Sequence, residues 1–209
     1  MERLQRKNQV PALGDLGSLI SLRDPRSLQM IIVVTGTPGT GKTVVATELA
    51  RRRGMEYLSL SQFVISNGLY TSFDQESSSY LLDEEKTKEQ LANYLRGRNV
   101  VVEAIYPSLV QGDSILVLRR HPLLVYRDLL SRGWSEAKVM ENVEAEALGV
   151  VEEEARETFD TVCSIDVSQL TVDEVIRRFE SRQCQSVDWL QDPSVEQFLQ
   201  SNITRKLPL

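Results

Sequence analysis

Residues 36–43 combine residue types and a spacing that suit the binding of a phosphate chain. They read Gly-Thr-Pro-Gly-Thr-Gly-Lys-Thr, which fits the pattern GxxxxGK[ST] in full. In this pattern the glycines let backbone N–H groups turn inward around phosphate oxygens, Lys42 reaches the β- and γ-phosphates, and the Thr43 hydroxyl can bind Mg²⁺. The contacts that we expect come from Gly36, Gly39, Thr40, Gly41, Lys42, Thr43 and Val44. The alternative is a glycine-rich turn that binds nothing, but the apolar run before it and the helical pattern after it favour a nucleoside triphosphate.

A carboxylate suited to a metal ion ends the third predicted strand. Glu103 follows Val100-Val101-Val102, and at that strand end it is the natural group to hold Mg²⁺ opposite Thr43, directly or through water. The alternative is a carboxylate that only caps the strand or pairs with a lysine. We therefore expect Thr43 and Glu103 to be the metal ligands.

Phosphoryl transfer also needs cations that neutralise the charge spreading over the transferred oxygens. The candidates are Lys42, Arg119, Arg120, Arg127 and Arg132. Arg132 is the best of the arginines, because it lies where one predicted helix breaks and another starts, a joint at which a short lid could close. Arg127 lies in the middle of a helix and is more typical of a surface charge. Trp134 suits either the core or a face that stacks on adenine, and the sequence does not decide between them. The predicted catalytic set is Lys42, Arg132 and Glu103.

Alternating strands and helices position these residues. The predicted strands are 30–35, 56–60, 99–103, 114–118 and 161–166. The predicted helices are 44–53, 62–66, 83–97, 122–133, a long one from Ser135 to about residue 157, 171–180, and a short one that begins at Asp192-Pro193. This order predicts an α/β fold: a five-stranded parallel sheet with helices on both faces and ligands beyond the carboxyl ends of the strands.

Two segments stand apart from that pattern. Residues 69–79 are polar and aromatic without periodicity, which indicates a functional loop or lid. In the long helix, Met140, Val143, Ala147, Val151 and Ala155 recur at helical spacing, so we expect Glu141, Glu144 and Glu152 to face solvent. His121 precedes Pro122 and is interpreted as a residue at the entry of a helix rather than a catalytic group.

The chain of 209 residues suits one core domain with appendages. We expect a weakly ordered extension over residues 1–29, a kinase-like core over 30–182, and a tail with a short helix over 183–209. Because the first strand opens at Met30, that residue is a candidate natural start. Asp15 interrupts the only apolar stretch before it, so a secretory signal is not expected.

The composition limits the partners that the chain suits. A net charge of −6 and a pI near 5.0 argue against broad nucleic-acid binding and against sequence-specific contacts with it, and suit a basic partner. No apolar run is long enough to cross a bilayer. Cys163 and Cys184 are too few and too far apart to indicate a disulfide framework or a zinc site, so a reducing, cytoplasmic setting is the default.

Several motifs occur together in one order: Thr35 to Thr43, Asn67-Gly68-Leu69-Tyr70, Val117-Leu118-Arg119, Arg132-Gly133-Trp134-Ser135, Lys138, and Glu141-Asn142-Val143-Glu144-Ala145-Glu146. In this combination the chain resembles the archaeal and eukaryotic adenylate-kinase-like ribosome assembly factors, a group that includes the coilin-interacting nuclear ATPase of animals. The resemblance covers roughly residues 30–180, and Val187-Asp188-Trp189 looks like the archaeal tail.

The resemblance implies a P-loop nucleoside monophosphate kinase fold, ATP as donor with Mg²⁺, and AMP as the favoured acceptor. It also implies slow ATP hydrolysis coupled to maturation of the small ribosomal subunit through a basic platform ribosomal protein. Carried over by position, the ATP contacts are Gly39, Gly41, Lys42, Thr43 and Val44, with Arg132 from the lid. The monophosphate-binding segment would span about 59–82 and the lid about 131–141, and Glu103 occupies the acidic position of the family.

The chain departs from the family at three positions. Ile105 stands where the family commonly has a histidine associated with ATP hydrolysis, so that step is expected to be weak or differently supported. Ser77 and Asp128 stand where arginines are common, which puts acceptor preference and rate in doubt. Two alternatives to an adenylate kinase therefore stay open: a nucleotide-switched assembly factor with little kinase turnover, and a small-molecule kinase with a different acceptor.

Overall fold

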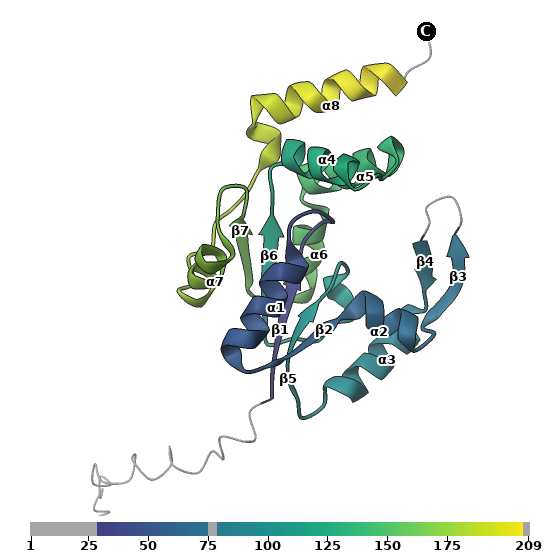
Figure 1. The fold of residues 1–209 in the computed structure, drawn as a ribbon, viewed down its shortest axis with the longest axis vertical. Coiled ribbons are helices and arrows are strands. Elements are labelled where there is room, and N and C mark those ends of the chain that lie inside the picture. Colours follow the sequence, from purple (N-terminus) through teal and green to yellow (C-terminus); the bar gives the residue numbers. More distant parts are fainter. Residues whose placement is uncertain (1–28, 75–78, 207–209) are drawn as a thin grey trace, which may run out of the picture.

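The central element of the computed structural model is a five-stranded, wholly parallel sheet (Figure 1). The structure describes residues 29–74 and 79–206, so the predicted extension lies almost entirely outside the described residues, as does Ser77. The strand order is β2-β5-β1-β6-β7. The strands are β1 Met30–Thr35, β2 Glu56–Ser59, β5 Asn99–Glu103, β6 Ser114–Arg119 and β7 Val162–Asp166. The predicted parallel sheet is confirmed.

The three central strands β5, β1 and β6 carry uninterrupted apolar runs because both faces of the sheet are covered. On one face, Ile32 and Val34 pack with α1 Lys42–Arg53 and α7 Val172–Glu180. On the other face, Ile31 and Val33 pack with the 3₁₀ turn η1 Pro107–Leu109 and with α2 Leu60–Ser66, α3 Glu84–Leu95 and α6 Val150–Thr158. The alternation of side chains along one strand thus joins two halves of the core.

A third apolar cluster lies beyond the carboxyl end of β6, where Figure 1 shows α4, α5 and α8 together. The elements here are α4 Pro122–Ser131, α5 Glu136–Leu148, the 3₁₀ turn η2 Trp189–Gln191 and α8 Pro193–Lys206. Val125 and Leu129 of α4 pack on Val139 and Val143 of α5, with Phe198 of α8 against them. These helices form a cap over the end of the sheet at which ligands of parallel α/β folds bind.

Local sequence signals set several helix ends. Asp83 and Ser135 cap α3 and α5 with side-chain hydrogen bonds, and Thr171 with Glu174 forms the predicted capping box of α7. The His121 side chain accepts a hydrogen bond from the Leu123 amide at the start of α4, which confirms it as a helix-entry residue.

The expectation of an irregular loop over residues 69–79 is corrected for the part of this segment that the structure describes, residues 69–74 and 79. Within the described residues they contribute to an antiparallel hairpin of β3 Tyr70–Asp74 and β4 Ser79–Leu82, which projects from the main sheet in Figure 1. Among the described residues these two strands pair only with each other, and a small hairpin of this kind needs little alternation of apolar and polar residues.

The long helix predicted from Ser135 is also corrected, because it is two helices. Gly149 ends α5 and starts α6 with φ +70°, a left-handed conformation that breaks the helical hydrogen bonding. Glu152, expected to face solvent, is 4% exposed. Its carboxylate accepts hydrogen bonds from Arg119, Arg156 and the Ser164 hydroxyl.

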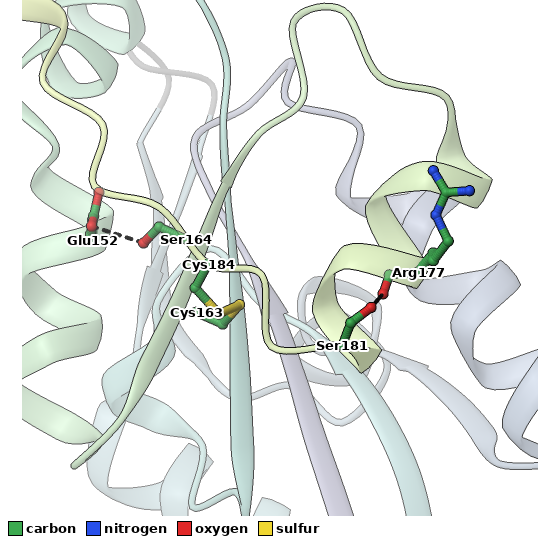
Figure 2. The surroundings of a disulfide bond; sticks show 6 residues. All are labelled: Glu152, Cys163, Ser164, Arg177, Ser181 and Cys184. Carbon is green, nitrogen blue, oxygen red and sulfur yellow. Dashed lines mark hydrogen bonds between the residues drawn. A yellow bond between two sulfur atoms is a disulfide. The ribbon is translucent and has the colours of Figure 1, made fainter.

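Cys163 and Cys184 form a disulfide, although their number and their separation in the sequence did not indicate one (Figure 2). Their Cα atoms lie 5.0 Å apart because the chain turns back after α7 and runs beside β7, where the Gln185 amide donates to the Ser164 carbonyl at 2.9 Å. The distance between the two cysteines in the sequence gave no indication that they are neighbours in the fold. In the part of the chain that the structure describes, no helix has both the length and the apolar character needed to cross a bilayer.

Candidate active site

A cleft of about 330 Å³ opens between the phosphate loop (residues 36–43), the end of β5 and the joint between α4 and α5. It is lined by Pro38, Gly39, Gly41, Lys42, Thr43, Val44, Ser61, Glu103, Ala104, Ile105, Arg132 and Trp134. Most of the residues predicted from the sequence thus meet at one place, although they come from three separate stretches of the chain. Gly36 and Thr40 lie below the surface of the loop instead of lining the cleft.

The backbone of the phosphate loop depends on its glycines. A Cβ atom at Gly36 would lie 2.5 Å from the Leu118 carbonyl oxygen, so the loop can pass the end of β6 only with glycine there. Gly41 has φ +89° and is the N-cap of α1, without a side chain to cap the helix. The first N–H groups of α1 therefore face an outside acceptor, together with the positive end of the helix dipole. This geometry fits the anionic tail of a nucleotide.

Lys42 lies below the loop and is only 6% exposed. Its ammonium group donates to the Thr37 carbonyl at 3.0 Å. Burial lowers the pKa of Lys42 from 10.5 to about 8, against the opposing effect of the Glu103 and Glu146 carboxylates, and the Arg132 guanidinium lowers it further. Lys42 also lines the cleft, next to the place where the sequence predicts the phosphates.

Thr43 and Glu103 are in direct contact, with the Thr43 hydroxyl donating to Glu103 Oε1 at 2.7 Å. The Tyr57 hydroxyl from β2 donates to the other carboxylate oxygen. Burial and the neighbouring carboxylate raise the pKa of Tyr57 to about 12, so it stays a donor at neutral pH. Tyr57 was not predicted, because its role depends on β2 lying beside β5 in the sheet.

The oxygens of Thr43 and Glu103 suit Mg²⁺, which is typically held by one or two protein oxygens together with substrate phosphates and water. Among the described residues, no group of three or more His, Cys, Asp or Glu side chains could hold a metal alone. The donor set therefore fits an ion that arrives with a nucleotide rather than a preformed metal centre.

Three of the four candidate arginines do not line the cleft. Arg119 is 3% exposed and pairs with Glu146 at 2.9 Å and with Glu152, so its charge is already neutralised inside the protein. Arg127 is exposed, with its guanidinium 3.7 Å from Asp128, which matches a surface charge. The expectation that Arg119 could stabilise transferred phosphate is therefore corrected.

Arg120 instead supports the loop from behind. Its guanidinium donates to the Gly39 carbonyl at 2.6 Å and pairs with Asp128 at 2.6 Å. Asp128, which stands where the resemblance predicts arginine, thereby orients Arg120. Arg132 is the only candidate arginine among those lining residues, and it is exposed at the joint between α4 and α5.

Trp134 is neither fully buried nor fully exposed. It packs partly against the α4–α5 cluster and also lines the cleft, with the Lys138 ammonium 4.8 Å from its ring centre. Ile105 lines the cleft as well and offers no polar atom there.

Comparison with known proteins identifies the family of this chain. A protein-family profile described as "AAA domain" matches residues 32–149, the part of the chain from β1 to the end of α5. A protein of Saccharolobus islandicus named "Putative adenylate kinase" is 47% identical over 174 residues, covering 82% of this chain and 93% of the relative. The chain belongs to the same family as this Saccharolobus protein. A family member from Thermococcus kodakarensis with the same name is 35% identical over 167 residues, covering 77% of this chain and 93% of the relative.

A solved structure shares the fold at much lower sequence similarity. Shikimate kinase from Acinetobacter baumannii, in complex with shikimate, has a TM-score of 0.55 and 15% identity, covering 87% of this chain and 97% of that chain. At that identity the likeness concerns the fold alone. The protein therefore has the fold of P-loop kinases, and the predicted architecture, similar to that of nucleoside monophosphate kinases, is confirmed.

Proposed function

We propose that this protein is an adenylate kinase that transfers the γ-phosphoryl group of MgATP to AMP, giving two molecules of ADP. The observation that carries the proposal is the meeting of Lys42, the Thr43–Glu103 pair and Arg132 in one cleft. The names of relatives up to 47% identical support the acceptor class. A Mg²⁺ ion held by Thr43 and Glu103 would neutralise phosphate charge there.

The roles proposed for the side chains follow from their contacts. Lys42 exchanges the Thr37 carbonyl for phosphate oxygens, a short move because its ammonium group is already under the loop. Gly39, Gly41, Thr43 and Val44 present the loop and the first turn of α1, while Gly36 and Thr40 keep the loop in shape. Arg132 approaches from the joint of α4 and α5 and stabilises charge that develops during transfer. The acceptor phosphate is already anionic, so transfer needs positioning more than a general base.

The proposal retains the division suggested by the sequence. Residues 59–82, now seen as α2 and the β3–β4 hairpin within the described residues, form the monophosphate-binding segment, and residues 131–141 form the lid. A cytoplasmic location is part of the proposal. The Cys163–Cys184 disulfide is compatible with it, because intracellular proteins of hyperthermophilic archaea are often rich in disulfides.

An acceptor assay tests this function. Purified protein is incubated with MgATP and each of AMP, CMP, GMP and UMP, and ADP formation is followed against Lys42→Ala. We expect rapid ADP formation with AMP and none in the variant. Turnover only with CMP, GMP or UMP would indicate a different monophosphate acceptor. No stimulation by any monophosphate would refute nucleoside monophosphate kinase activity and would favour a small-molecule kinase of the same fold.

A second candidate is a nucleotide-switched factor in maturation of the small ribosomal subunit, with a basic platform ribosomal protein as partner. The supporting observation is that Glu141 on α5 and Glu153 and Glu157 on α6 are exposed in a chain with net charge −6. Ile105 in the cleft offers no group to orient water, so ATP hydrolysis without an acceptor is expected to be slow. Co-purification with small-subunit precursors in the presence of ATP, and its loss on reversing these charges, tests this candidate.

A further inference from the structure

A buried carboxylate joins the phosphate loop to a distant part of the chain. Glu146 is 1% exposed, and its Oε2 accepts a hydrogen bond from the Thr37 hydroxyl at 2.6 Å. Its Oε1 accepts from Arg119 Nε at 2.9 Å, the Arg120 amide at 2.9 Å and Trp189 Nε1 at 3.1 Å. One side chain of α5 therefore contacts the loop, the end of β6 and the segment before α8.

The charges around Glu146 are balanced inside the protein. Arg119 lies between Glu146 and Glu152, and Arg156 pairs with the far side of Glu152 at 2.5 Å. The two carboxylates are thus balanced by two guanidinium groups, and each carboxylate is hydrogen-bonded to at least one of them. A buried network satisfied in this way has few alternative arrangements, so it fixes the positions of the groups bonded to it.

On the side of the nucleotide site, the network fixes the peptide of Thr37. The Thr37 carbonyl accepts hydrogen bonds from the Lys42 ammonium at 3.0 Å, the Thr40 hydroxyl at 2.9 Å and the Thr40 amide at 3.3 Å. The hydroxyl of the same residue is held by Glu146. The orientation of this peptide determines where Lys42 rests and how the loop curves.

On the other side, the network holds residues 185–192, which we call the strap. The strap begins after Cys184, and Figure 2 shows it leaving the disulfide and passing beside Ser164 and Glu152. The Val187 carbonyl accepts from Arg119 at 3.2 Å, and the Trp189 ring meets His121 edge-on at 5.2 Å between centres. The strap therefore covers the network and supplies one of its donors.

We propose that Glu146 is a positioning residue for the phosphate loop, and that the strap completes it through Trp189, so that strap and nucleotide site are energetically coupled. The proposal rests on the proposed function for the identity of the ligand, MgATP. Coupling between two sites is reciprocal. The strap therefore strengthens MgATP binding, and MgATP in turn stabilises the strap.

Substitutions at Thr37 test the loop side. Thr37→Val removes the hydroxyl and keeps the shape, and we expect MgATP affinity by calorimetry to fall roughly 10-fold, the range of one hydrogen bond to a charged group. AMP affinity should stay unchanged, and Thr37→Ser should restore MgATP binding. The matched control is Thr35→Val: Thr35 is also buried, and within the described residues its hydroxyl has no hydrogen-bond partner. This control should bind MgATP as the wild type does.

Substitutions in the strap test the other side. Trp189→Phe keeps an aromatic ring but removes the N–H bonded to Glu146, and it should weaken MgATP roughly 3-fold. Leu190→Ala, at an exposed neighbour in the strap, is the control and should have no effect. Because both contacts act through Glu146, Thr37→Val combined with Trp189→Phe should lose little more than Thr37→Val alone. Losses that multiply, or wild-type affinity in both single variants, would overturn the proposal.

A nucleotide-free measurement separates this inference from the proposed function. Hydrogen exchange at the Thr40 amide, which is bonded to the Thr37 carbonyl, should be several-fold faster in Thr37→Val and Trp189→Phe than in the two controls. If the wild type fails to bind MgATP, the proposed function falls, while faster exchange would still support the link from strap to loop. Unchanged exchange in both variants would refute that link, whatever the nucleotide result.

Discussion

Replacing Lys42 with methionine should remove activity and yet stabilise the protein. Lys42 is 6% exposed, and burial is the main cause that lowers its pKa from 10.5 to about 8. A lowered lysine pKa means that the folded state holds the proton less tightly than the unfolded chain does. Keeping the charge in the folded protein at neutral pH is therefore unfavourable.

The pKa difference sets the size of the effect. At about 1.4 kcal/mol for each tenfold change in proton affinity, a pKa of about 8 instead of 10.5 corresponds to about 3 kcal/mol. Methionine fills the same space without a charge. It leaves no orphaned acceptor, because the Thr37 carbonyl keeps its hydrogen bonds from Thr40. Lys42→Met should therefore raise the free energy of unfolding at pH 7 by about 2 to 3 kcal/mol.

The stability difference between Lys42→Met and the wild type should depend on pH. Below pH 8 both states of the wild type are protonated, so the full penalty is present. Between pH 8 and 10.5 the folded state has lost the proton while the unfolded chain still binds it, so wild-type stability rises with pH relative to the variant. The advantage of Lys42→Met should shrink across this window and disappear above it.

Urea unfolding followed by circular dichroism at pH 7, 8.5 and 10 measures these differences, with ADP formation measured on the same samples. Thr35→Val is a suitable control for a buried substitution that leaves the charge in place. A Lys42→Met variant that is less stable than the wild type at pH 7 would refute the reasoning. So would a stability difference that does not change with pH.

Three further outcomes follow from the site and the disulfide. Glu103→Gln should weaken MgATP binding by about 10-fold or more and leave metal-free ATP binding nearly unchanged, because the carboxylate contacts Thr43 at the expected metal position. Calorimetry with and without EDTA measures both affinities, and an equal fall in the two would contradict this role. Arg132→Ala should lower kcat by about 100-fold with stability within about 0.5 kcal/mol, since the side chain is exposed; an unchanged kcat in a steady-state assay would exclude Arg132 from the reaction. Cys184→Ser should lower unfolding stability by about 3 kcal/mol in oxidising buffer, because the Cys163–Cys184 bridge closes a loop with a sequence separation of 21; equal urea midpoints for variant and wild type would argue against the bridge.

The sequence predicted the phosphate loop and the sheet because both depend on local signals. The loop pattern fixes residue types at four positions within a span of eight, and most of the strands are short apolar runs bounded by turns. Glu103 followed from its place at the end of such a run. Since parallel strands end at the same edge of the sheet, the meeting of Glu103 with Thr43 needed no further information.

The residues that support the loop were missed because their roles depend on contacts between distant parts of the chain. Glu146 lies three positions after Val143 on the buried face of α5, a spacing that signals burial, yet only the fold shows its partners Thr37 and Trp189. Arg119 was one of the candidates for neutralising phosphate because it lies at the carboxyl end of a predicted strand. Its partners are the carboxylates of Glu146 on α5 and Glu152 on α6. The sequence analysis predicted one helix in place of these two and expected Glu152 to face solvent.

The break at Gly149 and the disulfide were missed for related reasons. A single glycine inside a periodic helical pattern is often tolerated, so periodicity outweighed it. The Gly149 turn lies against the Arg119 guanidinium, where an added Cβ would come within 3.3 Å, and this contact is visible only in three dimensions. The two cysteines are neighbours because the strap returns along β7, a path that no local pattern encodes.

Transfer of isotope-labelled phosphate tests the central claim most directly. Wild-type protein is incubated with AMP and Mg²⁺-ATP labelled in the γ-phosphate, and the products are separated and counted. The account predicts label in the β-phosphate of newly formed ADP, with little released as inorganic phosphate and neither product formed by Lys42→Met. A folded protein that binds MgATP but releases all of the label as inorganic phosphate would contradict it.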